Sequence, residues 1–177
     1  MQTVWQGFDD VRGNNSLRST RHHAEGHRTD RIGWLRVASR FRLQLYPGVD
    51  DTLRQLHPKY HLAVVTDAQS AYAIPELDAV GLSGYFDPII VSGDFGYRKP
   101  DRRLFLAALD AMKMEPSEVL FVGNDMYRDV YGAQKVGMKA VFFKSNQGTQ
   151  EKEGVKPDYS IFKFPELLNA VRFFEDQ

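Results

Sequence analysis

Three short runs of almost wholly apolar residues constrain the fold of this chain most strongly. They are His61–Thr66, Pro88–Ser92 and Glu118–Gly123. Runs this short and this apolar are typical of strands buried on both faces. Segments with the apolar spacing of helices lie between them, most clearly Asp101–Met114. Strands that alternate with helices predict an α/β fold, a three-layer sandwich around a mostly parallel, Rossmann-like sheet.

Weaker signals extend this pattern along the chain. Lys139–Phe143 and Asp158–Phe162 are predicted as further strands, and no internal repeat is present. The apolar spacing predicts helices over about residues 30–41, from Val49 to Leu56, through Pro75 to about Val80, from about Tyr127 to Val136, and over Pro165–Phe174.

Length and composition exclude several classes of protein. A chain of 177 residues suits one domain, and it has no cysteine, which excludes disulfides, thiolate catalysis and Cys-based metal sites. No apolar run approaches the roughly 20 residues that span a bilayer. Asp9 and Asp10 stand where a signal peptide would be apolar. We therefore expect a cytoplasmic protein with no membrane partner.

The N-terminal part of the chain differs from the rest in charge. Residues 1–42 hold eight arginines against four acids, although basic and acidic residues balance at 23 each over the whole chain. Residues 1–28 are predicted to form an Arg-rich flexible segment. The arginines could bind RNA, but no interleaved aromatics indicate base stacking, so a solvated arm without a nucleic-acid partner is expected.

Polar residues follow the predicted strands where each of them ends. Thr66 and Asp67 follow one strand, Lys99 lies in the loop after the next, and Asp125 and Asp129 follow the third. Because the carboxyl ends of parallel strands meet at one edge of the sheet, these side chains are predicted to converge there. The sequence therefore places a ligand site at this edge.

The residue types at this edge fit a phosphate and a divalent cation. Carboxylates as close as those of Asp125 and Asp129 repel unless a cation lies between them, and oxygen ligands of this kind suit Mg²⁺. Each residue also has a simpler explanation. Asp125 can be a helix N-cap and Asp129 an acid in the first helical turn. Lys99 can be a solvated surface lysine, and Thr66 a residue that favours strands.

Three segments together resemble the haloacid dehalogenase-like hydrolase superfamily, namely Leu62–Asp67, Gly96–Asp101 and Val119–Met138. Tyr46–Val49 also looks like that family's entry from a helical cap into the core. The resemblance covers roughly residues 29–175. It implies a core domain over residues 47–177 and a remnant of the cap over residues 29–46, with most of the cap missing.

The resemblance also implies an activity and a role for each matching residue. It implies a magnesium-dependent phosphatase that acts on small phosphorylated metabolites through an aspartyl-phosphate. The hydroxyl of Thr66 would hold the transferring phosphoryl group, with the backbone N–H of Asp67 beside it. Lys99 would neutralise its charge, and Asp125 and Asp129 would hold Mg²⁺.

One part of the family pattern is not found. The family's first motif is an apolar strand that ends in Asp-x-Asp-x-Thr and carries the nucleophile. The only candidate here is Val4–Val11, where Asp9 or Asp10 would be the nucleophile. Asp9 would leave Val11 at the general-acid position, and Asp10 would leave Arg12 there. Activity is therefore open, and the alternative is a non-catalytic sensor or scaffold that binds phosphate and magnesium.

The missing motif also removes a strand. In the family it lies between the strands that here end at Thr66 and Gly123. Without it, interior backbone groups would be unpaired, so the chain would be poorly stable, form a homodimer or recruit a substitute strand. Residues 3–8 are the predicted substitute. Alternatively the chain is a truncated gene product or has a mis-called start, and residues 1–28 are not family sequence.

Overall fold

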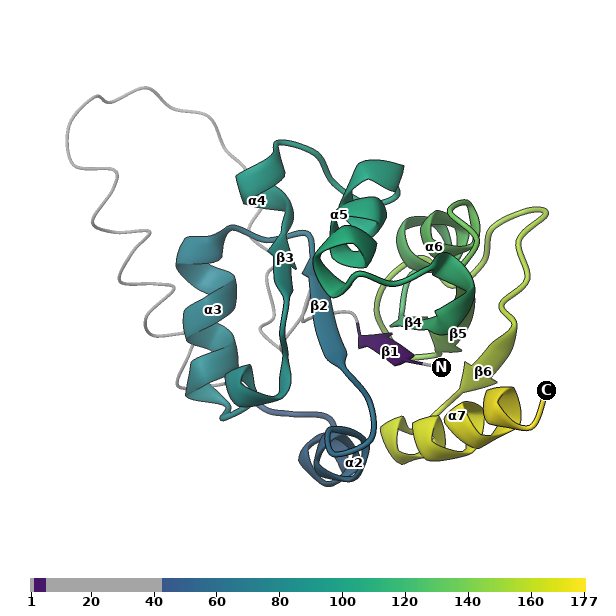
Figure 1. The fold of residues 1–177 in the computed structure, drawn as a ribbon, viewed down its shortest axis with the longest axis horizontal. Coiled ribbons are helices and arrows are strands. Elements are labelled where there is room, and N and C mark those ends of the chain that lie inside the picture. The colour runs from purple at the N-terminus through teal and green to yellow at the C-terminus, as the bar shows by residue number, and fades with distance from the viewer. Residues whose placement is uncertain (1, 6–42) are drawn as a thin grey trace.

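The sheet at the centre of the molecule has six parallel strands. The computed structural model describes residues 2–5 and 43–177. In spatial order the strands are β3, β2, β1, β4, β5 and β6 (Figure 1). Their bounds are Gln2–Trp5 for β1, Leu62–Thr66 for β2, Ile89–Val91 for β3, Val119–Gly123 for β4, Lys139–Phe143 for β5 and Tyr159–Ile161 for β6. The predicted parallel α/β sheet is confirmed.

Strand β1 occupies the central slot of the sheet. Val4 pairs with Ala63 of β2 and with Phe121 of β4, both in parallel register. This confirms that the N-terminal residues supply the substitute strand, as far as Trp5. Since the slot is filled, unpaired interior strands no longer give a reason to expect a homodimer, and dimerisation stays an untested prediction.

Helices cover both faces of the sheet. The α-helices are α2 (Val49–Leu56), α3 (Ser70–Ala79), α4 (Ser92–Phe95), α5 (Arg102–Met112), α6 (Gly132–Gln134) and α7 (Leu167–Glu175). Short 3₁₀ turns are η1 (Ser83–Tyr85), η2 (Pro116–Glu118) and η4 (Phe164–Glu166), and η3 (Met126–Tyr131) is a π-helical segment. Helices α2 and α7 lie on one side of the sheet, and α5 and α6 on the other (Figure 1).

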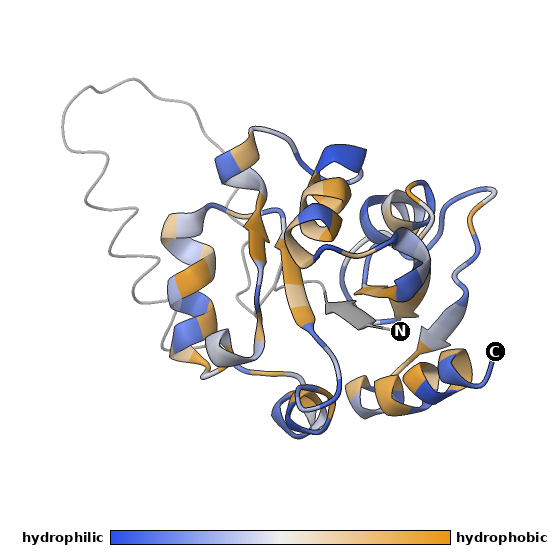
Figure 2. Ribbon diagram, in the orientation of Figure 1, coloured by the Kyte–Doolittle hydropathy of each residue, from blue (hydrophilic) through white to orange (hydrophobic). Residues whose placement is uncertain are grey.

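Two hydrophobic cores follow from the alternation of side chains along each strand. On β2, Leu62 and Val64 pack with α2 and α7, whereas Ala63 and Val65 pack with α5. All five residues of β2 and all five of β4 are buried. Figure 2 shows β2 and β3 as mainly hydrophobic stretches between helices of mixed hydropathy. Burial on both faces, which the apolar runs predict, is therefore confirmed for β2 and β4.

The predicted helix from Tyr127 to Val136 differs in form. It begins as the π-helical segment η3 and continues as the short helix α6. At the junction, a Cβ added to Gly132 would lie 2.6 Å from Cζ of Phe105 on α5. The glycine thus allows this segment to approach α5 more closely than a larger residue would.

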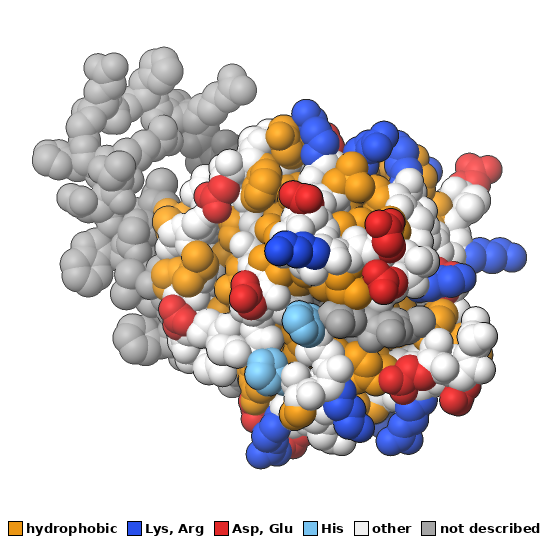
Figure 3. Space-filling model, viewed as in Figure 1, with side chains coloured by type: hydrophobic (Ala, Val, Ile, Leu, Met, Phe, Trp, Pro, Cys, Tyr) orange, Lys and Arg blue, Asp and Glu red, His pale blue; other side chains and the backbone are white. Residues whose placement is uncertain are grey.

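Several sequence expectations fall outside the described residues. These are most of the Arg-rich segment predicted over residues 1–28 and the helix predicted over about residues 30–41. Residues 2–5 of the Arg-rich segment are described, and there the expectation of a flexible segment is wrong because they pair as β1. Among the residues that the structure describes, no helix is long and apolar enough to cross a membrane. Figure 3 shows acidic and basic side chains interspersed over the face in view.

Candidate functional site

A buried lysine lies at the carboxyl edge of the sheet. The Nζ atom of Lys99 lies 3.1 Å from Oδ1 of Asp129 and donates a 3.1 Å hydrogen bond to the carbonyl oxygen of Val65. The side chains of Lys99 and Asp129 are both fully buried. Lys99 is therefore not the solvated surface lysine of the simpler explanation, and the fold brings it together with one of the two predicted magnesium ligands.

The end of β2 is tied to the same lysine. Thr66 is the last residue of β2 and is buried. The next residue, Asp67, accepts a 2.9 Å hydrogen bond at Oδ1 from the backbone N–H of Lys99. Both ends of Lys99, its amide and its ammonium, are thus held by residues of β2 and of the loop after it.

Asp125 is the N-cap of η3. Its Oδ1 accepts hydrogen bonds from the amides of Tyr127 (2.9 Å) and Arg128 (2.7 Å). Its Oδ2 accepts from Nε of Arg128 (3.0 Å) and from the amide of Thr149 (2.9 Å). Burial alone would raise the pKa of Asp125, but these hydrogen bonds and the Arg128 charge outweigh it and lower the pKa. The simpler explanation of Asp125 as an N-cap thus matches its geometry.

Asp129 connects the N-cap to the lysine. Its Oδ2 accepts a 2.8 Å hydrogen bond from the backbone N–H of Asp125, while its Oδ1 faces Lys99. The carboxylate of Asp129 is therefore turned toward the ammonium of Lys99, and that of Asp125 toward the amides of residues 127, 128 and 149. Asp125 and Asp129, the two predicted magnesium ligands, therefore form hydrogen bonds and ion pairs with different partners.

The described carboxylates do not by themselves fit a magnesium ion. Mg²⁺ is usually bound by one or two carboxylates whose oxygens face it. Here Asp125 accepts four hydrogen bonds from nitrogen donors, and Asp67 and Asp129 each face Lys99. Within residues 2–5 and 43–177, no group of three or more His, Cys, Asp or Glu side chains is placed to hold a metal. Magnesium binding by Asp125 and Asp129 stays a prediction.

Sequence reasoning missed two components of this edge. Arg128 bonds Asp125, and its Nη1 lies 3.7 Å from Oδ2 of Asp67. The loop after β5 also packs here, where Thr149 donates to Asp125 and Gly148 lies against Asn124. The polar run of residues 145–149 directly after an apolar strand was the signal that could have found the loop. Arg128 had no comparable signal.

The two candidate nucleophiles, Asp9 and Asp10, lie outside the described residues. They follow the end of β1 at Trp5, which pairs with Val64 and Val122. The carboxyl end of β1 therefore points to the same edge as those of β2 and β4. Whether either aspartate is the nucleophile stays a prediction.

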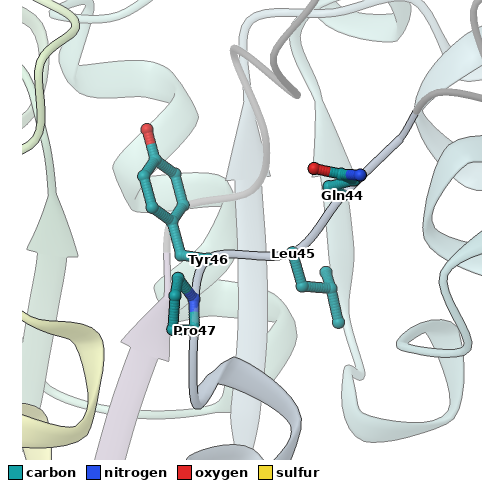
Figure 4. A pocket seen from close by; sticks show the side chains of 4 residues that line it. All are labelled: Gln44, Leu45, Tyr46 and Pro47. Atoms are coloured by element: carbon teal, nitrogen blue, oxygen red, sulfur yellow. The ribbon is translucent and has the colours of Figure 1, made fainter.

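A pocket lies beside the segment that enters α2. In the described part of the chain it is lined by Gln44, Leu45, Tyr46 and Pro47 (Figure 4). The ring of Tyr46 packs edge-on against Phe143 of β5, 5.2 Å between centroids. None of the polar residues of the edge described above is among these lining residues. The pocket lies instead at the predicted junction between cap remnant and core.

A family comparison agrees with this arrangement of strands and strand-end residues. The model of the haloacid dehalogenase-like hydrolases matches residues 31–143, more than half of the chain. The chain belongs to this family. The family match covers α2, the strands β2 to β5 and every described residue of the site except the loop that begins after β5.

Several curated and solved relatives of this family member are phosphatases by name, and other similar solved structures are named dehalogenases. A glyceraldehyde 3-phosphate phosphatase of Pyrococcus furiosus is 32% identical over 132 residues, 73% of this chain and 55% of that protein. A phosphoserine phosphatase of Thermus thermophilus is 31% identical over 74% of this chain and 53% of its own length. The crystal structure of a HAD phosphatase from Thermococcus onnurineus superposes with a TM-score of 0.71 and 33% identity, covering 79% of this chain and 64% of that one. The chain spans about half the length of the curated relatives it matches.

Proposed function

We propose that this family member is a phosphatase of small phosphorylated metabolites. The observation that carries the proposal is the fully buried ammonium of Lys99, held at the carboxyl edge of the sheet beside the end of β2. A positive charge removed from water acts strongly on a phosphoryl group, because little solvent screens it. The names of the curated relatives support the same class of substrate.

In the proposed reaction the chain's own residues position and neutralise the phosphoryl group. The hydroxyl of Thr66 and the amide of Asp67 would bind its oxygens, and Lys99 would offset its charge. Asp129 keeps the ammonium of Lys99 in place. The aspartate nucleophile that the family resemblance implies would come from Asp9 or Asp10, which follow β1.

The charge balance of this edge supports the need for a further cation. Among the described residues that meet at this edge, Asp67, Asp125 and Asp129 carry three formal negative charges, against two positive charges on Lys99 and Arg128. A phosphate would meet this net negative charge, so an added divalent cation should favour its binding. Magnesium dependence is therefore part of the proposal, although the carboxylates of Asp67, Asp125 and Asp129 face nitrogen donors in the structure.

Hydrolysis of p-nitrophenyl phosphate by the purified full chain, with and without MgCl₂, tests this function. The proposal expects magnesium-dependent hydrolysis that is lost in Lys99→Gln and retained in Lys139→Gln, an exposed lysine at the other end of the sheet that pairs with Asp158. Asp9→Asn and Asp10→Asn then show which aspartate is needed. Hydrolysis that survives in Lys99→Gln would contradict the proposal.

A second candidate is a non-catalytic protein that binds phosphate and magnesium as a sensor or scaffold. The observation that favours it is the sequence after β1, where neither Asp9 nor Asp10 is followed by the family's general acid and threonine. Phosphate binding without hydrolysis, by a chain shown to be folded by circular dichroism, would favour this candidate over the phosphatase.

A further inference from the structure

Asp67 places a buried negative charge where the proposed function needs to bind an anion. Its side chain is 3% exposed and follows Thr66 at the end of β2. A buried carboxylate is costly unless a cation lies near it, and it also repels a bound phosphate. Asp67 therefore needs a partner that cancels its charge.

Arg128 is placed to be that partner. Its Nη1 lies 3.7 Å from Oδ2 of Asp67, and its Nε donates a 3.0 Å hydrogen bond to Oδ2 of Asp125. The backbone of Arg128 is also held in place, because its N–H and that of Tyr127 both donate to Oδ1 of the N-cap residue Asp125. The guanidinium is thus held between the end of β2 and the start of η3.

These contacts belong to a closed network of hydrogen bonds and ion pairs that includes Lys99. Arg128 lies near Asp67, which accepts a hydrogen bond from the amide of Lys99. The ammonium of Lys99 pairs with Asp129, which accepts a hydrogen bond from the amide of Asp125. Asp125 then bonds Arg128 again. A change in the charge of any one of these residues therefore alters the electrostatic interactions of the others at short range.

We propose that Arg128 is a positioning residue of the phosphate site, which neutralises Asp67 so that the charge of Lys99 acts on the bound phosphoryl group. The inference rests on the proposed function and adds a residue and a role to it. It makes the need for Arg128 conditional on the carboxylate of Asp67. An asparagine at position 67 can still accept the hydrogen bond from the amide of Lys99. It leaves Arg128 beside Asp125 alone, whose carboxylate also accepts hydrogen bonds from three backbone amides.

The test is a double-mutant cycle on the full chain with Arg128→Gln, Asp67→Asn and the double variant. Isothermal titration calorimetry with inorganic phosphate in the presence of MgCl₂ gives the affinity. Arg128→Gln alone should weaken phosphate binding by about tenfold, the effect of one uncompensated charge at this range. In the Asp67→Asn background the same change should alter the affinity by less than about twofold. Equal weakening in both backgrounds would overturn the inference and indicate that Arg128 acts through Asp125 or on the ligand directly.

A second readout separates this inference from the proposed function. The midpoint of urea unfolding should fall in Arg128→Gln and recover in part when Asp67→Asn is added, with no ligand present. Arg54→Gln is the matched control, because Arg54 also pairs with an acid three residues earlier, Asp51, but on an exposed surface. It should leave both readouts unchanged. Failure of the wild-type chain to bind phosphate would overturn the proposed function and this role together. If the wild type binds phosphate but Asp67→Asn restores neither the phosphate affinity nor the urea midpoint of Arg128→Gln, this inference alone would be overturned.

Discussion

Lys99 and Asp129 form an ion pair in which Nζ and Oδ1 lie 3.1 Å apart and both side chains are fully buried. The carbonyl of Val65 accepts a hydrogen bond from Lys99, and the amide of Asp125 donates one to Asp129. Such a pair contributes little net stability but is costly to break, because the remaining charge is left in a medium that solvates it poorly. The pair therefore fixes where the positive charge of this edge lies.

Loss of Asp129 should destabilise the fold. We expect Asp129→Asn to lower the free energy of unfolding by about 3–5 kcal/mol, because it leaves the ammonium of Lys99 without its counter-charge. Urea unfolding followed by circular dichroism measures this change. Asp51→Asn, which breaks an exposed pair with Arg54, serves as the control and should cost less than about 1 kcal/mol. Equal effects of the two changes would argue against a buried pair.

The N-cap at Asp125 should make the free energy of unfolding depend on pH in the acidic range. Since the pKa of this carboxyl is lowered in the folded chain, its stabilisation is complete above the ordinary pKa of about 4 and is lost as the pH falls through the folded value. Asp125→Asn should therefore be less stable than the wild type at pH 7 by about 1–3 kcal/mol, with a smaller difference at pH 3. Urea midpoints across this range provide the measurement. The exposed Asp78→Asn is the control, and a difference independent of pH would refute the prediction.

Gly148 should tolerate no side chain. Its φ is +75°, and an added Cβ would lie 2.5 Å from the carbonyl oxygen of Asn124. Gly154 has a φ of +74° with no atom within 4 Å of such a Cβ. Gly148→Ala should therefore destabilise the chain by about 1–3 kcal/mol more than Gly154→Ala, which carries only the backbone strain. Thermal unfolding of the two variants compares them directly, and equal melting temperatures would show that the loop after β5 is not pressed against Asn124.

Much of the sheet could be predicted because its strands are buried on both faces. That burial leaves an apolar run such as Leu62–Thr66, which differs clearly from the helices beside it. The family resemblance implied a central strand between β2 and β4, and the cost of unpaired backbone groups made residues 3–8 the predicted substitute for it. The π-helical form of η3 was not predicted, because the apolar spacing of residues 127–136 does not distinguish a π-helix from an α-helix.

The candidate site was predictable in its residues more than in their contacts. Polar residues after apolar strands identified Thr66, Lys99 and Asp129 by position. Spacing alone could not decide whether the carboxylate of Asp125 faces a cation or the amides of η3, since both arrangements use the same four-residue separation. The contacts of Arg128 with Asp67 and Asp125 depend on how its side chain is oriented between the ends of β2 and β4, which the sequence does not specify.

Direct binding of phosphate tests whether Lys99 provides the positive charge of a phosphate site. Isothermal titration calorimetry should be run with inorganic phosphate and MgCl₂ on the wild type, Lys99→Gln and the control Lys139→Gln. We expect the wild type and the control to bind phosphate with equal affinity, and Lys99→Gln, still folded, to bind it at least about tenfold more weakly. Equal affinity in all three proteins, or no binding by the wild type, would contradict this role of Lys99.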